Sequence, residues 1–298
     1  MRVFVTGASG WIGSAVTAEL IADGHHVVGL ARSDESAAAV EAMGATAERG
    51  SLHDPDGLAQ AAGDADGVVH LAFIHDFDDY AAAGRAEHAA VHAMLVALEG
   101  SDRPFLLASG LASGVQGRLL TENDASPFHG PDSLRGGSEN LALDFADRGV
   151  RSVALRFAPT VHGMQDHGFT AQLFRIARER GSAGYVGDGW TRWAAVHRAD
   201  AARLVRLALE GAPGGTRVHA VAEEGLLSRD IAAAIGEQLG VPPVSVATEE
   251  VAAHFGWIGR FFGMDIAASS DLTRKLLDWH PQGPTLLEDI ADGAYALA

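Results

Sequence analysis

The chain has 298 residues, 47% of them hydrophobic, and it contains no cysteine. It therefore has no thiolate nucleophile, disulfide, Cys-ligated zinc or iron–sulfur cluster. Lys+Arg total 22 against 39 Asp+Glu, and the resulting net charge of −17 repels nucleic-acid phosphates. No apolar run approaches the roughly 20 residues that cross a bilayer, and Met1 leads directly into a strand-like segment. We therefore expect a cytoplasmic protein that acts on a small molecule, without a membrane or nucleic-acid partner.

Short apolar runs alternate with longer amphipathic stretches along most of the chain. The predicted strands are Val3 to Val5, Val27 to Leu30, Val68 to Ala72, Phe105 to Ala108, Val153 to Phe157 and Val218 to Val221. The predicted helices are Ile12 to Ala22, Glu35 to Met43, Tyr80 to Leu98, Ser138 to Arg148 and Asp200 to Leu209. This alternation predicts an α/β fold of the Rossmann type, with a doubly wound parallel sheet.

The first strand runs directly into three glycines, Gly7, Gly10 and Gly13, which are followed by a helical stretch. This arrangement is typical of a dinucleotide-binding loop. The first glycine permits a tight turn, the second lets the backbone approach a pyrophosphate, and the third lets the helix pack closely on the strand. The strand before the loop and the helix after it supply the context that this motif requires.

The end of the second strand meets the adenosine ribose of a bound dinucleotide, and an acidic residue there would bind the 2′-hydroxyl. This chain has Ala31-Arg32-Ser33 instead. A guanidinium and a hydroxyl suit a 2′-phosphate, so Arg32 and Ser33 predict a preference for NADP(H), with NAD(H) as the alternative cofactor.

After residue 157 the alternation loosens. Gly-rich loops with tryptophans occupy residues 181–193, and a mostly helical tail follows from about residue 226. We therefore predict a dinucleotide-binding domain of residues 1–157, to which residues 196–222 return. Residues 158–195 and 223–298 form a smaller, mostly helical substrate-binding lobe that closes over the cofactor at the carboxyl ends of the strands.

Two pairs of residues invite a functional interpretation. Trp190 and Trp193 flank Arg192 in a loop, where they either line a substrate pocket or fill the core of the lobe. His88 and His92 lie four residues apart on a helix, but no third ligand follows an obvious pattern, so no metal site is predicted.

Across nearly the whole chain these motifs resemble the short-chain dehydrogenase/reductase superfamily, especially its extended or atypical branch of epimerase- and dehydratase-like proteins. Segments 6–13, 50–52, 70–73, 108–110 and 155–163 resemble the successive strand ends of that branch, and 187–200 is similar to its GDG…R…VHxxD signature. The resemblance implies an NAD(P)-dependent enzyme and, by family habit, a homodimer through the helices at 80–98 and 138–148. The cofactor contacts that it implies, beside Arg32 and Ser33, are Gly7, Ser9, Gly10, Trp11, Ile12, Gly13, Ser51, Leu52, Leu71, Ala72, Phe73, Ser109, Arg135, Ala158, Pro159 and His162.

The catalytic Tyr-x-x-x-Lys of this family is absent. None of the tyrosines, Tyr80, Tyr185 and Tyr295, has a lysine four residues on, and Lys275 is the sole lysine. Counting back from Gly149-Val150 through Glu139 places Arg135 at the lysine position and Pro131 at the tyrosine position. Arg135 is expected to orient the nicotinamide ribose, but a proline cannot transfer a proton.

Another residue must then protonate the developing alkoxide or stabilise its charge. The candidates are two histidines, which titrate near neutral pH, and two serines: His129, His162, Ser109 and Ser113. We interpret the chain as an NADP(H)-dependent oxidoreductase that transfers a hydride to or from a small, uncharged carbonyl or imine. The alternatives are a nucleotide-sugar epimerase or dehydratase, and a dinucleotide-binding sensor without catalysis.

Overall fold

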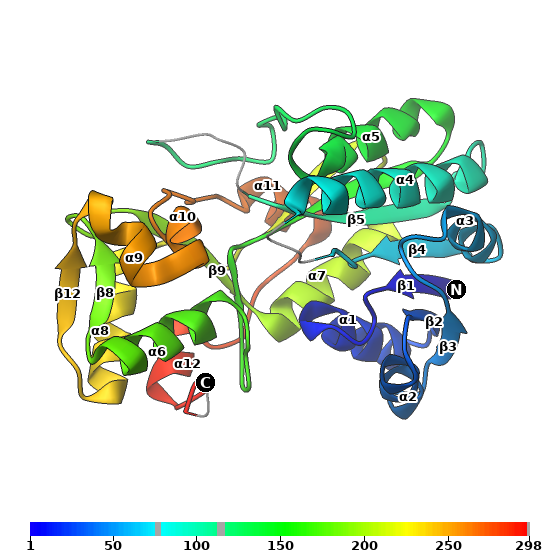
Figure 1. The fold of residues 1–298 in the computed structure, drawn as a ribbon. Helices are drawn as coiled ribbons and strands as arrows, with labels where there is room; N and C mark the ends of the chain where they lie inside the picture. The colour runs from blue at the N-terminus through cyan, green and yellow to red at the C-terminus, as the bar shows by residue number, and fades with distance from the viewer. Residues whose placement is uncertain (75–78, 112–116, 297–298) are drawn as a thin grey trace.

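A seven-stranded parallel sheet forms the centre of the computed structural model, which describes residues 1–74, 79–111 and 117–296 (Figure 1). The strand order is β10-β6-β5-β4-β1-β2-β3. The strands are β1 (Arg2–Thr6), β2 (His26–Ala31), β3 (Thr46–Arg49), β4 (Gly67–His70), β5 (Pro104–Gly110), β6 (Arg151–Phe157) and β10 (Thr216–Ala220). The order reverses between β1 and β4, where doubly wound sheets bind ligands. The predicted fold is confirmed.

Helices cover both faces of this sheet, because each central strand is apolar on both sides (Figure 1). On one face, Val3 and Val5 share a core with α1 (Trp11–Ala22), α2 (Asp34–Ala42) and α7 (Arg198–Gly211). On the other, Phe4 shares a core with α3 (Pro55–Gly63), α4 (Tyr80–Leu98) and α5 (Ser138–Asp144). The predicted helix at 138–148 is α-helical in its first part, α5, and ends in a 3₁₀ turn, Phe145–Arg148.

A second lobe adjoins the carboxyl ends of the strands (Figure 1). Its helices are α6 (Phe169–Arg180), α8 (Ser228–Leu239), α9 (Val251–Phe255), α10 (Gly259–Phe262) and α12 (Leu286–Ala291), whereas α11 (Asp271–Leu277) packs on α7 and on β10 of the central sheet. The lobe also contains two small sheets, β11-β9-β7 and β12-β8, which the sequence did not predict. These strands are β7 (Thr160–His162), β8 (Ala183–Val186), β9 (Arg192–His197), β11 (Glu223–Leu227) and β12 (Pro243–Val246).

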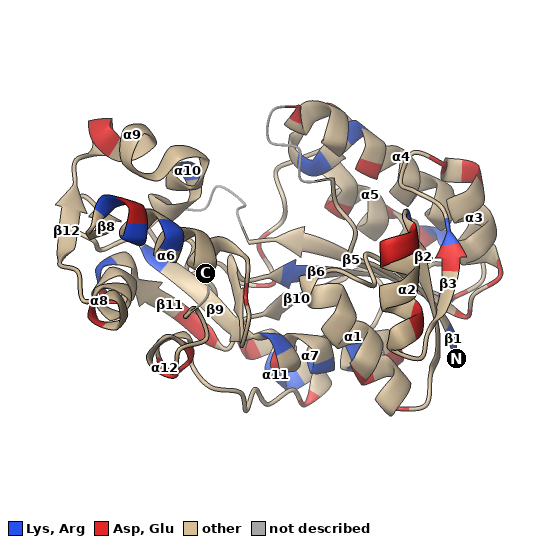
Figure 2. Ribbon diagram, turned by 60° about the horizontal axis from the view of Figure 1, so that its bottom comes forward, with Lys and Arg blue, Asp and Glu red and all other residues tan. Residues whose placement is uncertain are grey.

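Charged residues lie mainly on the helices and on the edge strand β3, but β6 also carries a basic segment within the central sheet (Figure 2). The polarity of β3, whose sequence is TAER, explains why no apolar run predicts it. No helix within the described residues combines the length and the apolar character that a membrane span requires.

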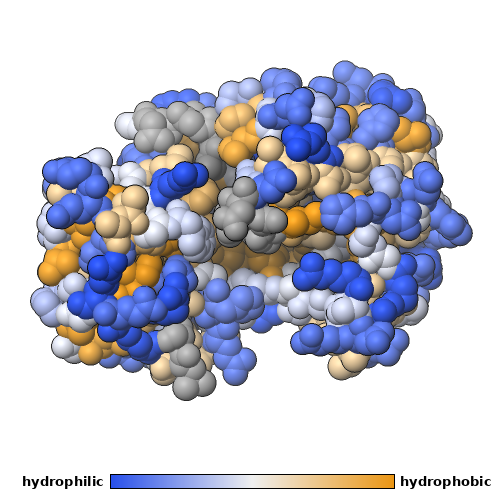
Figure 3. Space-filling view, viewed as in Figure 1, coloured by the Kyte–Doolittle hydropathy of each residue, from blue (hydrophilic) through white to orange (hydrophobic). Residues whose placement is uncertain are grey.

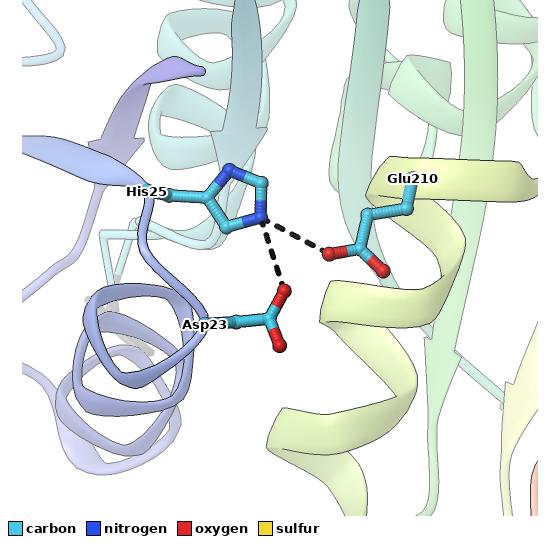
Figure 4. Close-up of side chains that lie close together, drawn as sticks. All are labelled: Asp23, His25 and Glu210. Atoms are coloured by element: carbon cyan, nitrogen blue, oxygen red, sulfur yellow. Dashed lines mark hydrogen bonds and ion pairs between the residues drawn. The ribbon is translucent and has the colours of Figure 1, made fainter.

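An ion-pair network joins the end of α1 to α7. Nε2 of His25 lies 3.1 Å from Glu210 and 3.8 Å from Asp23 (Figure 4). The ligand atoms of this trio lie within 4.8 Å of one another, as in a metal site. However, Arg206 already supplies positive charge there, with bonds of 2.9 Å to Glu19 and 3.0 Å to Glu210. The network therefore holds the two helices together without requiring a metal.

Candidate active site

The glycine loop between β1 and α1 has the geometry of a phosphate-binding turn. Gly7 has a φ of +70°, and a Cβ on it would lie 2.9 Å from the Ala72 nitrogen. A Cβ on Gly13 would lie 1.9 Å from the Gly7 oxygen, so the helix packs directly on the turn. Gly10 is the N-cap of α1 and brings no side-chain cap, which leaves N–H groups for an anion. The loop therefore fits a dinucleotide pyrophosphate.

Gly13→Ala is expected to lower the free energy of unfolding by about 1–3 kcal/mol and to weaken cofactor binding, because the added methyl group would push the helix away from the turn. Urea unfolding and a fluorescence titration with NADPH measure the two effects. Gly63→Ala on α3 is the matched control, since a Cβ there meets no atom within 4 Å. Wild-type stability and affinity in Gly13→Ala would show that the close contact is not required.

The predicted 2′-phosphate site lies between β2 and α2. Arg32 is exposed, and no ion pair or hydrogen bond of its side chain occurs among the residues that the structure describes. Ser33 is the N-cap of α2, and its hydroxyl accepts a hydrogen bond from the Ser36 nitrogen at 3.2 Å. The guanidinium is therefore open to a ligand, whereas the hydroxyl already caps a helix. The acidic Asp34 beside them pairs with Arg49 at 2.8 Å.

Next to the glycine loop, β1 and β4 are joined by a buried hydrogen-bond pair. The Thr6 hydroxyl lies 2.8 Å from Nδ1 of His70 and accepts from the Ala72 nitrogen at 3.2 Å. Burial, together with the positive charge of Arg135, lowers the pKa of His70 to about 3. His70 is therefore neutral at physiological pH and stabilises the segment that follows β4.

A cavity of about 1070 Å³ lies where the strands β5 and β6 end and the second lobe begins. On the sheet side it is lined by Phe73, Ser109, Arg135, Glu139, Phe157, Ala158 and Pro159, among others. The lobe contributes mainly apolar side chains, including Phe169, Val251, Trp257, Phe261, Met264 and Ile266. Hydrophobic residues are visible at the bottom of the hollow between the two lobes (Figure 3). Tyr80 and Glu87 reach the same cavity from α4.

Arg135 lies in this cavity on the turn Leu134–Gly137, where its own φ is +51°. Its guanidinium pairs with the buried carboxylate of Glu87, donates to the Ala108 carbonyl at 3.3 Å and covers the Phe73 ring at 4.2 Å. A left-handed conformation is costly for a residue with a side chain, so these contacts must hold the turn. The structure thus places a fixed positive charge at the end of β5.

Ser109 belongs to a second polar network at the cavity. Its hydroxyl donates to Glu139 at 2.7 Å, and Glu139 accepts bonds of 2.6 and 3.1 Å from the buried Arg156. Burial alone would raise the pKa of Glu139, but the hydrogen bonds and charge of Arg156 outweigh it and hold that pKa below its ordinary value. Ser109 therefore faces a carboxylate, and its oxygen lone pairs remain available to a ligand.

Sequence reasoning missed the roles of Glu87, Glu139 and Arg156. Glu87 lies on the buried face of α4, and Arg156 interrupts the apolar run of β6. A charged residue at a buried position requires a partner, so these two positions carried a usable signal.

Most of the four predicted proton-donor candidates are not shown to lie at the cavity. His129 is exposed, and its Nε2 lies 3.2 Å from the Asn140 amide, while Ser113 falls outside the described residues. His162 is fully buried and pairs with Asp289 at 2.6 Å, and it does not line the cavity. Of the four candidates, Ser109 alone is shown to line the cavity.

The three predicted substrate residues do not line the cavity either. Arg192 forms a bidentate pair with Asp265, at 2.9 and 2.7 Å. Trp193 is fully buried and packs edge to face on Phe262, because its large ring fills the core of the lobe. Trp190 is exposed beneath the guanidinium of Arg229. Of the two interpretations, core filling describes Trp193, whose contact with Phe169 supports the cavity wall from behind.

Comparison with known proteins supports the fold and an NAD(P)-binding function. A family model described as NAD(P)H-binding matches residues 7–129. The structure of a UDP-glucuronic acid 4-epimerase from Bacillus cereus, in complex with UDP-glucuronic acid and NAD, superposes with a TM-score of 0.76. The two share 19% identity over 99% of this chain and 98% of that one, so this likeness concerns the fold.

Relatives by sequence include reductases. An uncharacterized protein of Saccharomyces cerevisiae is 45% identical over 97% of this chain and 98% of its own. The 2′-dehydrokanamycin reductase of Streptomyces kanamyceticus is 30% identical over 84% of this chain and 70% of its own. A ketoreductase of Stigmatella aurantiaca, named for a 4-farnesyl-dihydroquinoline oxide, is 28% identical over 72% and 66%. The chain therefore belongs to the short-chain dehydrogenase/reductase superfamily of NAD(P)-binding proteins.

Proposed function

We propose that the protein is an NADP(H)-dependent reductase of uncharged, largely apolar carbonyl or imine compounds. The observation that carries this proposal is the cavity, in which Ser109 and the fixed charge of Arg135 face an apolar wall from the second lobe. Pockets of this kind bind a ligand through apolar contacts and orient it with a few polar groups. The sequence relation to two reductases supports the proposal.

The glycine loop would hold the pyrophosphate of the cofactor, Arg32 its 2′-phosphate, and Arg135 the nicotinamide ribose. When bound, the dihydronicotinamide supplies the hydride. The segment of Phe157, Ala158 and Pro159, which lines the cavity after β6, would border the nicotinamide. Ser109, whose own proton is donated to Glu139, would accept a hydrogen bond from an N–H or O–H group of the substrate or the product alcohol.

Arg192 argues against a nucleotide-sugar substrate. In epimerase-like relatives the corresponding arginine meets the diphosphate of the sugar nucleotide, but here Asp265 occupies the Nε–Nη2 edge of the guanidinium. Releasing it for a ligand would leave the Asp265 carboxylate without this partner. Among the described residues that the lobe contributes to the cavity, Arg260 is the one cation.

The cofactor preference is tested by titrating the protein with NADPH and NADH and following fluorescence. We expect NADPH to bind at least tenfold tighter, a difference of about 1.4 kcal/mol, and Arg32→Ala to abolish most of that difference. Arg175→Ala, on the exposed surface of α6, is the control and should leave both affinities unchanged. Tighter binding of NADH, or an unchanged preference in Arg32→Ala, would contradict the role of Arg32.

Catalysis is tested separately, by following NADPH oxidation with a panel of carbonyl probes: 2-nonanone, acetophenone and cyclohexanone. Turnover of one or more probes supports a reductase. Tight cofactor binding without any turnover would instead favour the non-catalytic sensor.

A further inference from the structure

The chain has lost the tyrosine that this superfamily uses as its proton donor, yet a tyrosine still reaches the cavity. Tyr80 lines it, whereas Tyr185 lies in β8 and Tyr295 donates its hydroxyl to Asp166 at 2.8 Å. We propose that the Tyr80 phenol, at the start of α4, is the proton donor of the reduction and replaces the missing tyrosine. This inference rests on the proposed reductase function.

The packing of α4 brings Tyr80 and Arg135 to the same side of the cavity. Tyr80, Gly84 and Glu87 follow one another on one face of the helix, at intervals of four and three residues. A Cβ on Gly136 would lie 2.1 Å from the Gly84 oxygen, so the turn that carries Arg135 lies directly against this face. Arg135 then pairs with Glu87, which fixes the guanidinium against this face of the helix.

The Phe73 ring connects the phenol and the guanidinium. It lies 5.4 Å from the Tyr80 ring, at an angle of 55° between the planes, and 4.2 Å from the Arg135 guanidinium carbon. Burial raises the pKa of Tyr80, the positive charge of Arg135 lowers it, and Glu87 raises it, so that the pKa lies above its ordinary value. The phenol therefore carries its proton at neutral pH, as an ordinary tyrosine also does, and it is the place of Tyr80 in the cavity wall that makes it a candidate donor.

The step balances as follows. The hydride would leave a C–H bond of the dihydronicotinamide, which is thereby oxidised by two electrons, and would form a C–H bond at the carbonyl carbon. The π pair of the carbonyl group would then move to its oxygen. The O–H bond of Tyr80 breaks as its proton bonds to that oxygen, and the alcohol is released. The electron pair left on Tyr80 forms a phenolate, which the charge of Arg135 stabilises until solvent returns a proton.

Tyr80→Phe removes the hydroxyl and keeps the ring that packs on Phe73. We expect kcat/KM for the carbonyl probe that the wild type reduces best to fall by about 100-fold or more, the usual contribution of a general acid. The dissociation constant for NADPH should stay within about twofold, because the ring that packs on Phe73 is retained. Tyr185→Phe, the control in the lobe, should retain wild-type kinetics.

A readout independent of turnover comes from ¹³Cζ labelling of the three tyrosines. The resonance missing in Tyr80→Phe belongs to Tyr80. We expect it to show a neutral phenol at pH 7 and to shift when NADPH binds, while the resonance missing in Tyr185→Phe stays in place. A Tyr80 remote from the bound cofactor would not shift, so this readout tests the position of the phenol while the kinetics of Tyr80→Phe test its role.

The possible failures are distinguishable. If the wild type reduces a probe and Tyr80→Phe is equally active, the Tyr80 assignment is overturned and the reductase function stands. A phenolate at pH 7, or a resonance that ignores the cofactor, also overturns the assignment. If the wild type binds NADPH and reduces no probe, the reductase function fails, and the donor role of Tyr80 fails with it.

Discussion

Replacing Arg156 with methionine is expected to lower the free energy of unfolding by about 3–5 kcal/mol, the usual cost of removing one partner from a buried ion pair. Arg156 is fully buried, and its two hydrogen bonds to Glu139 compensate that carboxylate for its loss of water. Methionine keeps a long unbranched chain, so the effect reports the lost charge more than a lost volume. Urea unfolding at pH 7 measures it.

Arg217→Met is the matched control for this prediction. Arg217 donates to the same carboxylate at 3.2 Å, but its side chain is partly exposed, so its loss should cost about 1 kcal/mol or less. The double variant Glu139→Gln/Arg156→Met should be more stable than Arg156→Met, because no unpaired charge remains buried. Equal losses in Arg156→Met and Arg217→Met would contradict the buried pair as the source of stability.

The loss of stability caused by Arg156→Met should also depend on pH. The pKa of Glu139 is lowered in the folded protein, so the stability that its carboxylate contributes is present above the pKa of the unfolded chain, about 4.3. That contribution is lost as pH falls through the lower pKa of the folded state. In Arg156→Met the unpaired Glu139 would take up a proton more readily, so the difference in stability between wild type and variant should shrink in acid.

Lowering the pH from 8 to 5 is expected to reduce the free energy of unfolding by about 2 kcal/mol through His70 alone. Its pKa is about 3 when folded and about 6.5 when unfolded. Between those values the unfolded chain binds a proton that the folded chain excludes, so stability falls as pH falls. The shift results from the burial of the ring between β1 and β5, aided by the charge of Arg135.

His70→Asn tests this prediction, because the Asn amide can replace Nδ1 in the hydrogen bond to Thr6. Urea unfolding of both proteins at pH 5, 6, 7 and 8 gives the comparison, in which the other titrating groups cancel. The wild type should lose about 2 kcal/mol more than the variant across this range. Parallel curves would mean that His70 titrates alike in the folded and unfolded states.

Local patterns were enough to predict the architecture and the cofactor loop. The alternation of apolar runs and amphipathic stretches predicted six of the seven central strands, and the strand-glycine-helix order predicted the turn at Gly7. These signals suffice because backbone conformation and side-chain periodicity depend on neighbouring residues. Counting along the chain likewise singled out Arg135, which does line the cavity.

The chemistry around that loop depended on contacts between distant parts of the chain. The pairs of Arg135 with Glu87, Arg192 with Asp265 and His162 with Asp289 join residues 48, 73 and 127 positions apart. These pairs decide which polar groups are free to meet a ligand. Arg192 and His162, which the sequence placed at the site, are held by their partners and do not line the cavity. The sequence by itself thus determined the fold and the turn of the glycine loop. Tertiary packing alone decided which side chains surround the substrate, because burial selects partners by distance in space and not along the chain.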